Sequence, residues 1–158
     1  MMKMMMKMNH IMKISGPKLL MISYNSKNSK SICLYENNKK ERILKKPVEI
    51  LEEYCLKNGS SFDGRAASFC YVTGARQKPA ILISERTQDI YFPTASKEND
   101  QCVWILYNRI LHVKRSKEIK TKVLFTDGTS IILPLDIRVI LNQMKRCEAF
   151  LDALNGIQ

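Results

Sequence analysis

The chain has 158 residues, which suits one domain with a substantial core, and its 45% hydrophobic and 26% charged residues are ordinary for a soluble globular protein. Its net charge of +11 and its pI near 9.5 are expected of a protein that contacts a polyanion, either nucleic acid or an anionic membrane surface. Charge that serves only solubility is the alternative interpretation.

The positive charge is concentrated toward the two ends of the chain. Residues 1–46 hold 11 Lys and Arg against 2 acids, residues 47–101 hold 6 against 8, and residues 102–158 hold 9 against 5. The three net charges are therefore +9, −2 and +4. A nearly neutral centre with basic flanks favours a nucleic-acid-binding protein over one with evenly spread solubilising charge.

Residues 1–18 form a Met-rich start in which Lys3, Lys7, Lys13 and Lys18 interrupt the apolar residues. These lysines leave neither a signal-peptide core nor a membrane span, so we expect no membrane partner and a cytoplasmic protein. If the basic flanks bind nucleic acid, the protein is expected to be nucleoid-associated. A disordered basic tail is one interpretation of residues 1–18. A basic amphipathic membrane helix is the other, although no Trp or Phe anchors favour it. The folded domain is then expected at 19–158.

Short apolar runs at residues 19–24 and 31–35 predict two strands of a hairpin, to which residues 42–45 add a third. A helix is predicted over residues 47–58, because Pro47 suits the first helical position and apolar residues follow at helical spacing until Asn58 and Gly59. Asp63 is the expected cap of a second short helix over residues 65–71.

Residues 80–84 and 89–92 predict a second hairpin. Residues 102–113 are apolar on both alternating faces, which predicts one long central strand with Trp104 in the core. Asp127-Gly128, between β-rich runs, is the signature of a type I′ hairpin.

The last predicted element is a helix capped by Asp136 and ended by Asn155-Gly156. Its predicted apolar stripe consists of Ile137, Ile140, Leu141, Met144, Cys147, Leu151 and Leu154. Its outer face carries Arg138, Asn142, Lys145 and Arg146 and is either solvated or in contact with phosphates. The expected fold is a single α+β domain of mostly antiparallel β hairpins with two to three packing helices.

Candidate DNA-binding residues occur in three places. Ser60, Ser61 and Arg65 lie on a turn at a helix start, where hydroxyls, backbone N–H groups and a guanidinium suit a phosphate, although an ordinary turn with a solvated arginine is an equal alternative. Arg76 and Lys78 precede Pro79. The third group follows the predicted long strand and consists of Lys114, Arg115, Lys117, Lys120 and Lys122.

No catalytic, cofactor or metal motif is found in the sequence. The five cysteines include no Cys-x-x-Cys pair and only two histidines are present, so we predict reduced, mostly buried thiols, no metal site and no cofactor. Phosphate loops, nucleophile elbows and zinc-protease motifs are missing, and we predict no enzymatic activity. A small enzyme with its site at the 60–65 loop and a nearby cysteine is kept as an alternative.

Four motifs at a characteristic spacing indicate a family resemblance. They are Gly-Ser-Ser-Phe-Asp-Gly-Arg at 59–65, Lys-Pro at 78–79, Phe-Pro-Thr-Ala-Ser at 92–96 and Gln-Cys-Val-Trp at 101–104. Together they resemble the ComK family, the competence transcription factors of low-GC Gram-positive bacteria, over roughly residues 50–147. Longer members of that family continue past the helix that is last here.

The resemblance implies an oligomeric activator that recognises AT-rich boxes in double-stranded DNA through the minor groove and switches on competence genes. It also implies a proteolytic adaptor as a partner. Minor-groove readers need no long recognition helix, because Arg and Lys on loops and strand ends sense a narrow, electronegative groove. The alternative function is that of a shortened paralogue, an interaction module or antagonist that binds a full-length factor without activating transcription.

Overall fold

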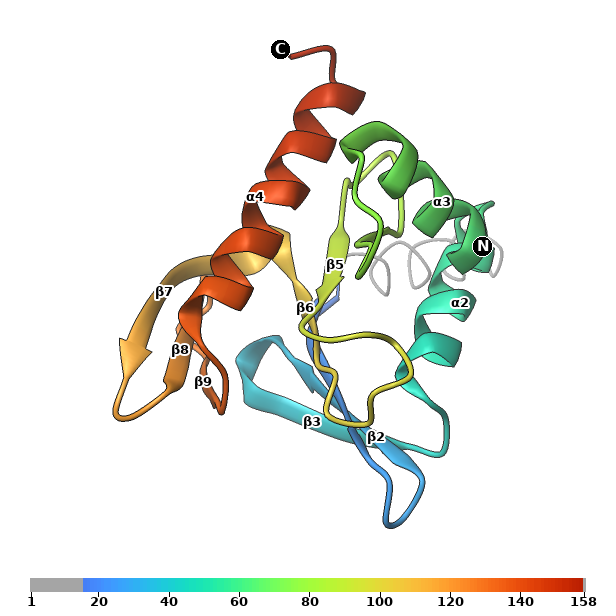
Figure 1. Ribbon diagram of the computed structural model, residues 1–158. Coiled ribbons are helices and arrows are strands. Elements are labelled where there is room, and N and C mark those ends of the chain that lie inside the picture. Colours follow the sequence, from blue (N-terminus) through green and yellow to red (C-terminus); the bar gives the residue numbers. More distant parts are fainter. Residues whose placement is uncertain (1–15, 158) are drawn as a thin grey trace, which may run out of the picture.

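Two antiparallel sheets and three α-helices make up the computed structural model, which describes residues 16–157 (Figure 1). The predicted tail at 1–18 lies almost wholly outside these residues. The strands are β1 (Leu19–Asn25), β2 (Lys30–Tyr35), β3 (Lys39–Ile43), β4 (Ile81–Leu82), β5 (Ile90–Pro93), β6 (Trp104–Leu106), β7 (Ile110–Ser116), β8 (Lys120–Phe125) and β9 (Ser130–Leu133). The helices are α2 (Pro47–Lys57), α3 (Phe62–Thr73) and α4 (Ile137–Leu154), with short 3₁₀ turns η1 (Glu36–Asn38) and η2 (Tyr107–Arg109).

Six strands form the larger sheet in the order β3-β2-β1-β6-β5-β4, and three form the smaller in the order β7-β8-β9. Every recorded strand pair is antiparallel, which confirms the α+β prediction. The predicted hairpins at the start of the chain and at 80–92 are confirmed. The third strand comprises Lys39–Ile43, so the prediction at 42–45 was placed too late.

The larger sheet separates two hydrophobic cores. Strand β6 shows how, because Trp104 and Leu106 enter the core that α2 covers whereas Ile105 enters the core that α4 and the smaller sheet cover. Alternate residues of a strand point to opposite faces, so three residues serve both cores. Trp104 is 2% exposed, which confirms its predicted burial.

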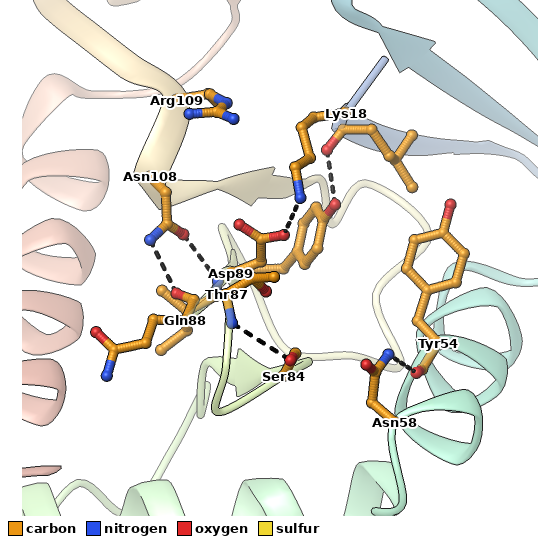
Figure 2. Close-up of polar contacts among 12 residues, drawn as sticks. Lys18, Tyr54, Asn58, Ser84, Thr87, Gln88, Asp89, Asn108 and Arg109 are labelled. Atoms are coloured by element: carbon orange, nitrogen blue, oxygen red, sulfur yellow. Dashed lines mark hydrogen bonds and ion pairs between the residues drawn. The ribbon is translucent and has the colours of Figure 1, made fainter. Parts of the chain in front are cut away.

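The predicted single strand at 102–113 is wrong, because the chain leaves the larger sheet at Leu106 and enters the smaller one at Ile110. The side chain of Asn108 occupies the break. Its Oδ1 accepts a bond from Ile90 N at 2.9 Å and its Nδ2 donates to Gln88 O at 2.8 Å (Figure 2). These bonds take the place of backbone hydrogen bonds between strands at the start of β5. Leu111 beyond the break is 63% exposed, as suits the edge strand of a small sheet.

The hairpin at Asp127-Gly128 is confirmed, but its predicted type I′ turn is wrong. That turn needs positive φ at both central residues. Here only Gly128 has one, at 92°, and its N–H donates to Phe125 O at 3.0 Å. Phe125 N also donates to Thr129 O at 2.8 Å, which closes a three-residue loop. The Asp127 carboxylate accepts bonds from the backbone of Thr129 and of Asn37, and these hold this loop form.

Two details of the helices differ from prediction. Ser61 rather than Asp63 caps α3, accepting a bond from Gly64 N at 3.0 Å, so the helix begins earlier than predicted. Asp136 caps α4 as predicted, accepting from Arg138 N at 2.8 Å. The buried stripe of α4 includes Gln143 and Phe150 where Leu141 and Leu154 were expected.

Phe150 anchors α4 in the second core, where its ring centroid lies 5.1 Å from that of Phe69. We expect Phe150→Ala to lower the free energy of unfolding by about 3–5 kcal/mol, because it leaves a cavity. Leu154→Ala, at a position that is 45% exposed, should lower it by less than about 1 kcal/mol. Urea unfolding followed by the red shift of Trp104 emission measures both, and equal losses would contradict this description of the core.

Candidate nucleic-acid interface

The predicted DNA-binding residues lie in three separate parts of the structure. Ser60, Ser61 and Arg65 lie at the start of α3, Arg76 and Lys78 lie in the loop between α3 and β4, and the remaining five lie on the β7–β8 hairpin. In Figure 1 the hairpin projects on the side of the molecule away from α2 and α3. The structure therefore does not bring Arg65 together with the hairpin lysines.

The turn before α3 uses its polar groups internally. Ser60 Oγ donates to Cys55 O at 3.1 Å, and Ser61 Oγ accepts the capping bond. One guanidinium nitrogen of Arg65 lies 3.3 Å from Glu85 Oε1, and the Arg65 side chain is only 15% exposed. Its Nε is buried without a hydrogen-bond partner among the described residues. The polar groups of this turn are therefore largely engaged or covered within the protein.

The β7–β8 hairpin concentrates unpaired positive charge. Lys114 lies directly opposite Lys122 in the strand register, on the face turned away from α4. Like charges opposite each other destabilise a sheet. Arg115, opposite the buried Thr121, lies on the other face, and Lys117 lies in the connecting turn. No ion pair is recorded for any of the five predicted cations of this hairpin within residues 16–157. An anionic partner would relieve this repulsion.

Three adjoining surface hollows join this hairpin to the loop that carries Arg76 and Lys78. Lys78 lines both the first and the second hollow, and Arg138 lines both the second and the third. The cations that line them form one continuous surface, called here the basic face: Arg76, Lys78, Lys97, Arg115, Lys120, Arg138 and Arg146.

Sequence reasoning found only part of the basic face. It predicted Arg76, Lys78, Arg115 and Lys120, and it left Arg138 and Arg146 undecided between solvent and phosphate. It missed Lys97, which lies in a polar loop with no local signal. In the structure the ammonium group of Lys97 lies 5.5 Å from the ring centroid of Phe62.

Three acidic residues also line these hollows, Glu98, Glu118 and Asp136, and Asp136 lines two of the three. A bidentate contact with Arg138, 2.9 Å at its shorter side-chain distance, together with the backbone N–H of Arg138, lowers the pKa of the Asp136 carboxyl to about 2. The carboxylate therefore stays ionised and offsets part of the charge of Arg138. The net charge of the surface remains positive.

A further hollow of about 510 Å³ lies at the other end of the larger sheet and contains Lys18, Tyr54, Ser84 and Asp89 (Figure 2). Of its two lysines, Lys18 is neutralised, because Lys18 Nζ lies 2.7 Å from Asp89 Oδ2. His112, the histidine within residues 16–157, does not line it. Lys57 and Arg86 also line this hollow, but among the described residues it places no histidine beside a nucleophile.

The thiols do not favour the alternative of a small enzyme. Cys55, beside the 60–65 turn, is buried, and burial raises the pKa of its thiol. Burial raises the pKa of Cys33 to about 11 and that of Cys147 further. Reactive cysteines have lowered pKa values. Within the described part of the chain no cluster of His, Cys, Asp and Glu could hold a metal ion.

An α+β domain with a continuous, mostly unpaired basic face is typical of nucleic-acid-binding proteins. The chain matches the family model described as ComK protein over residues 10–155, so it belongs to the ComK family. It is 34% identical over 101 residues to the competence transcription factor of Bacillus subtilis (strain 168), an alignment that covers 64% of this chain and 53% of that protein. The chain thus spans about half the length of this relative. No solved structure matches it significantly.

Family membership supports the prediction of a non-enzymatic regulator. Of the helices α2, α3 and α4, none has the length and apolar character that crossing a membrane requires.

The lowered pKa of Asp136 predicts an acid-dependent loss of stability. The folded-state pKa of about 2 lies below the usual value near 3.9, so the carboxylate stabilises the fold above about pH 4 and its contribution disappears as the pH falls toward 2. NMR titration of the Asp136 carboxyl carbon measures this pKa. In Arg138→Gln it should rise toward the usual value, and an unchanged pKa in that variant would contradict the assigned cause.

Proposed function

We propose that this chain is a DNA-binding transcriptional regulator that binds AT-rich promoter boxes through the minor groove and switches on the genes of DNA uptake. The observation that carries the proposal is the basic face together with the outer lysines of the β7–β8 hairpin. The name of the B. subtilis relative agrees with this function. Salt-dependent attraction to phosphates supplies most of the affinity of such surfaces.

The distribution of charge on the helices favours DNA contacts through the hairpin and a loop and not through a helix. The first turns of α2 and α3 carry Glu49 and Asp63, and the C-terminal half of α4 carries Glu148 and Asp152. A helix along the major groove would bring such acids close to phosphates. The β7–β8 hairpin and the 75–79 loop carry several Lys and Arg side chains, as suits groups that enter an electronegative minor groove.

The remaining parts of the proposal concern assembly and location. A homo-oligomer would place two basic faces on paired boxes, because closed symmetric assemblies are the rule among soluble oligomers. We further propose a basic tail at 1–18 beside a domain at 19–158, a proteolytic adaptor as a regulatory partner, and a cytoplasmic, nucleoid-associated location. No cofactor takes part in this scheme.

A second candidate is an interaction module that binds a full-length factor without activating transcription. Exposed apolar side chains on α2 and α3 favour it, since Tyr71 is 91% exposed and Leu56 is also exposed. Such a module would form mixed oligomers and would bind DNA weakly. Titration of AT-rich and GC-rich duplexes at two salt concentrations separates the two candidates.

Neutralising hairpin lysines should reduce the salt dependence of DNA binding. We expect Lys114→Gln and Lys122→Gln each to flatten the slope of log K against log salt by about 0.9, because each removes one phosphate contact. Both variants should bind AT-rich and GC-rich duplexes more weakly, and to the same extent. Lys57→Gln, on the exposed end of α2, is the matched control and should leave the slope unchanged. An equal change of slope in Lys57→Gln would mean that the effect reflects the net charge of the protein and not contacts of the hairpin.

The predicted contact of Arg65 is tested by base composition. If its guanidinium enters a narrow groove, Arg65→Ala should lose roughly 1–3 kcal/mol more binding free energy on A-tract than on GC-rich DNA. Arg65→Lys should not restore the binding to A-tract DNA, because lysine lacks the planar fork of the guanidinium. Ser60→Ala and Ser61→Ala test the hydroxyls beside it. No loss in any of these variants would leave the 60–65 turn as a purely structural element.

A further inference from the structure

Two polar residues of α4 hold the loop that carries Arg76 and Lys78. Gln143 is 2% exposed, and its Nε2 donates to Lys78 O at 3.0 Å and to Pro93 O at 2.7 Å. Arg146 donates to Gln143 Oε1 and, through a second guanidinium nitrogen, to Gln77 O at 2.6 Å. The carbonyls of two consecutive loop residues are therefore fixed to one helix.

The backbone of this loop needs such support. Lys78 has a φ of 53°, in the left-handed region that residues other than glycine rarely occupy. It also precedes Pro79, and the residue before a proline is normally extended. A loop in this conformation persists only when surrounding contacts determine it. Here the contacts come from the side-chain amide of Gln143 and the guanidinium of Arg146.

Arg146 is suited to holding the loop because its guanidinium has several donors in a fixed plane. It lies over the Phe69 ring, 5.4 Å from the centroid, and is partly buried, so burial lowers its pKa from the usual value. A lysine would keep the charge but could not bond both Gln143 Oε1 and Gln77 O in the same geometry. Its role in the loop can therefore be separated from its charge.

We propose that Gln143 and Arg146 are positioning residues that hold the 75–79 loop so that Arg76 and Lys78 face the DNA. The inference rests on the proposed function and adds to it, because it names residues that act on DNA affinity through the loop. Removing the Gln143 amide would leave the carbonyls of Lys78 and Pro93 without their donor and release the loop, while α4 itself stays anchored by Cys147 and Phe150.

Limited trypsin digestion tests the loop without DNA. Trypsin cuts after Arg76 but not between Lys78 and Pro79, so cleavage after Arg76 reports on this loop alone. We expect Gln143→Met and Arg146→Lys to speed that cleavage about tenfold, while cleavage after Arg86, in a distant turn, stays at the wild-type rate. Blue-shifted Trp104 emission confirms that each variant is folded. Unchanged cleavage after Arg76 in both variants would overturn the proposal.

DNA titration then tests the purpose of the loop. Gln143→Met and Arg146→Lys should each weaken AT-rich duplex binding roughly tenfold, the equivalent of about one lost specific contact. Arg86→Lys is the charge-conserving control and should bind like the wild type. In a background that carries Arg76→Ala and Lys78→Ala, Gln143→Met should cause no further loss, because coupled residues are not additive. An equal loss in that background would overturn the positioning role.

If the proposed function is wrong, the DNA affinity of the loop variants shows it separately from the cleavage rates. If Arg76→Ala with Lys78→Ala leaves DNA affinity at the wild-type level, the proposed contacts of this loop with DNA are wrong. The cleavage rates would still decide whether Gln143 and Arg146 hold the loop.

Discussion

The structure depends on a three-residue strand that is buried on both faces. Trp104, Ile105 and Leu106 pair with β1 on one side and β5 on the other, and their side chains enter two different cores. A strand covered on both faces requires a layer on each side of the sheet. Helix α2 provides one layer, while α4 and the smaller sheet provide the other. Removing either layer would expose large apolar side chains of the same strand.

The end of this strand determines where the positive charge is displayed. At residues 107–109 the chain turns out of the larger sheet, and Asn108 satisfies the backbone of β5 at that point. The following strand then starts a small sheet whose hairpin projects from the body (Figure 1). Helix α4 packs on β5 and on β7, so its first turns lie between the hairpin and the 75–79 loop. Cations that are distant in sequence are thereby brought onto one surface.

Local patterns were sufficient to predict most elements but not their junctions. Capping and turn residues located α2, α4 and the hairpins. Alternation of apolar residues could not distinguish one strand of twelve residues from two strands in different sheets, because apolar residues continue past the break although Leu111 there is 63% exposed. The turn at Asp127 depends on Asn37, which is 90 residues away. No local pattern could show this.

The candidate site was predictable to a similar extent. Runs of lysine on the hairpin are visible in the sequence, and so is Lys78 before Pro79. The inward direction of Arg146 and the ion pair of Arg65 with Glu85 arise from long-range packing. A helical wheel places Arg146 on the outer face, whereas the structure uses it to hold a backbone carbonyl. Charge in a sequence therefore favours a class of partner but does not assign the role of each residue.

Hydrogen exchange of the full chain with and without an AT-rich duplex tests the central claim most directly. The duplex should slow exchange in residues 75–79 and 112–122, where the basic face and the hairpin meet the DNA, and should do so less at high salt. Slowed exchange confined to residues 60–65 or 84–89, with the hairpin unaffected, would contradict the proposed interface.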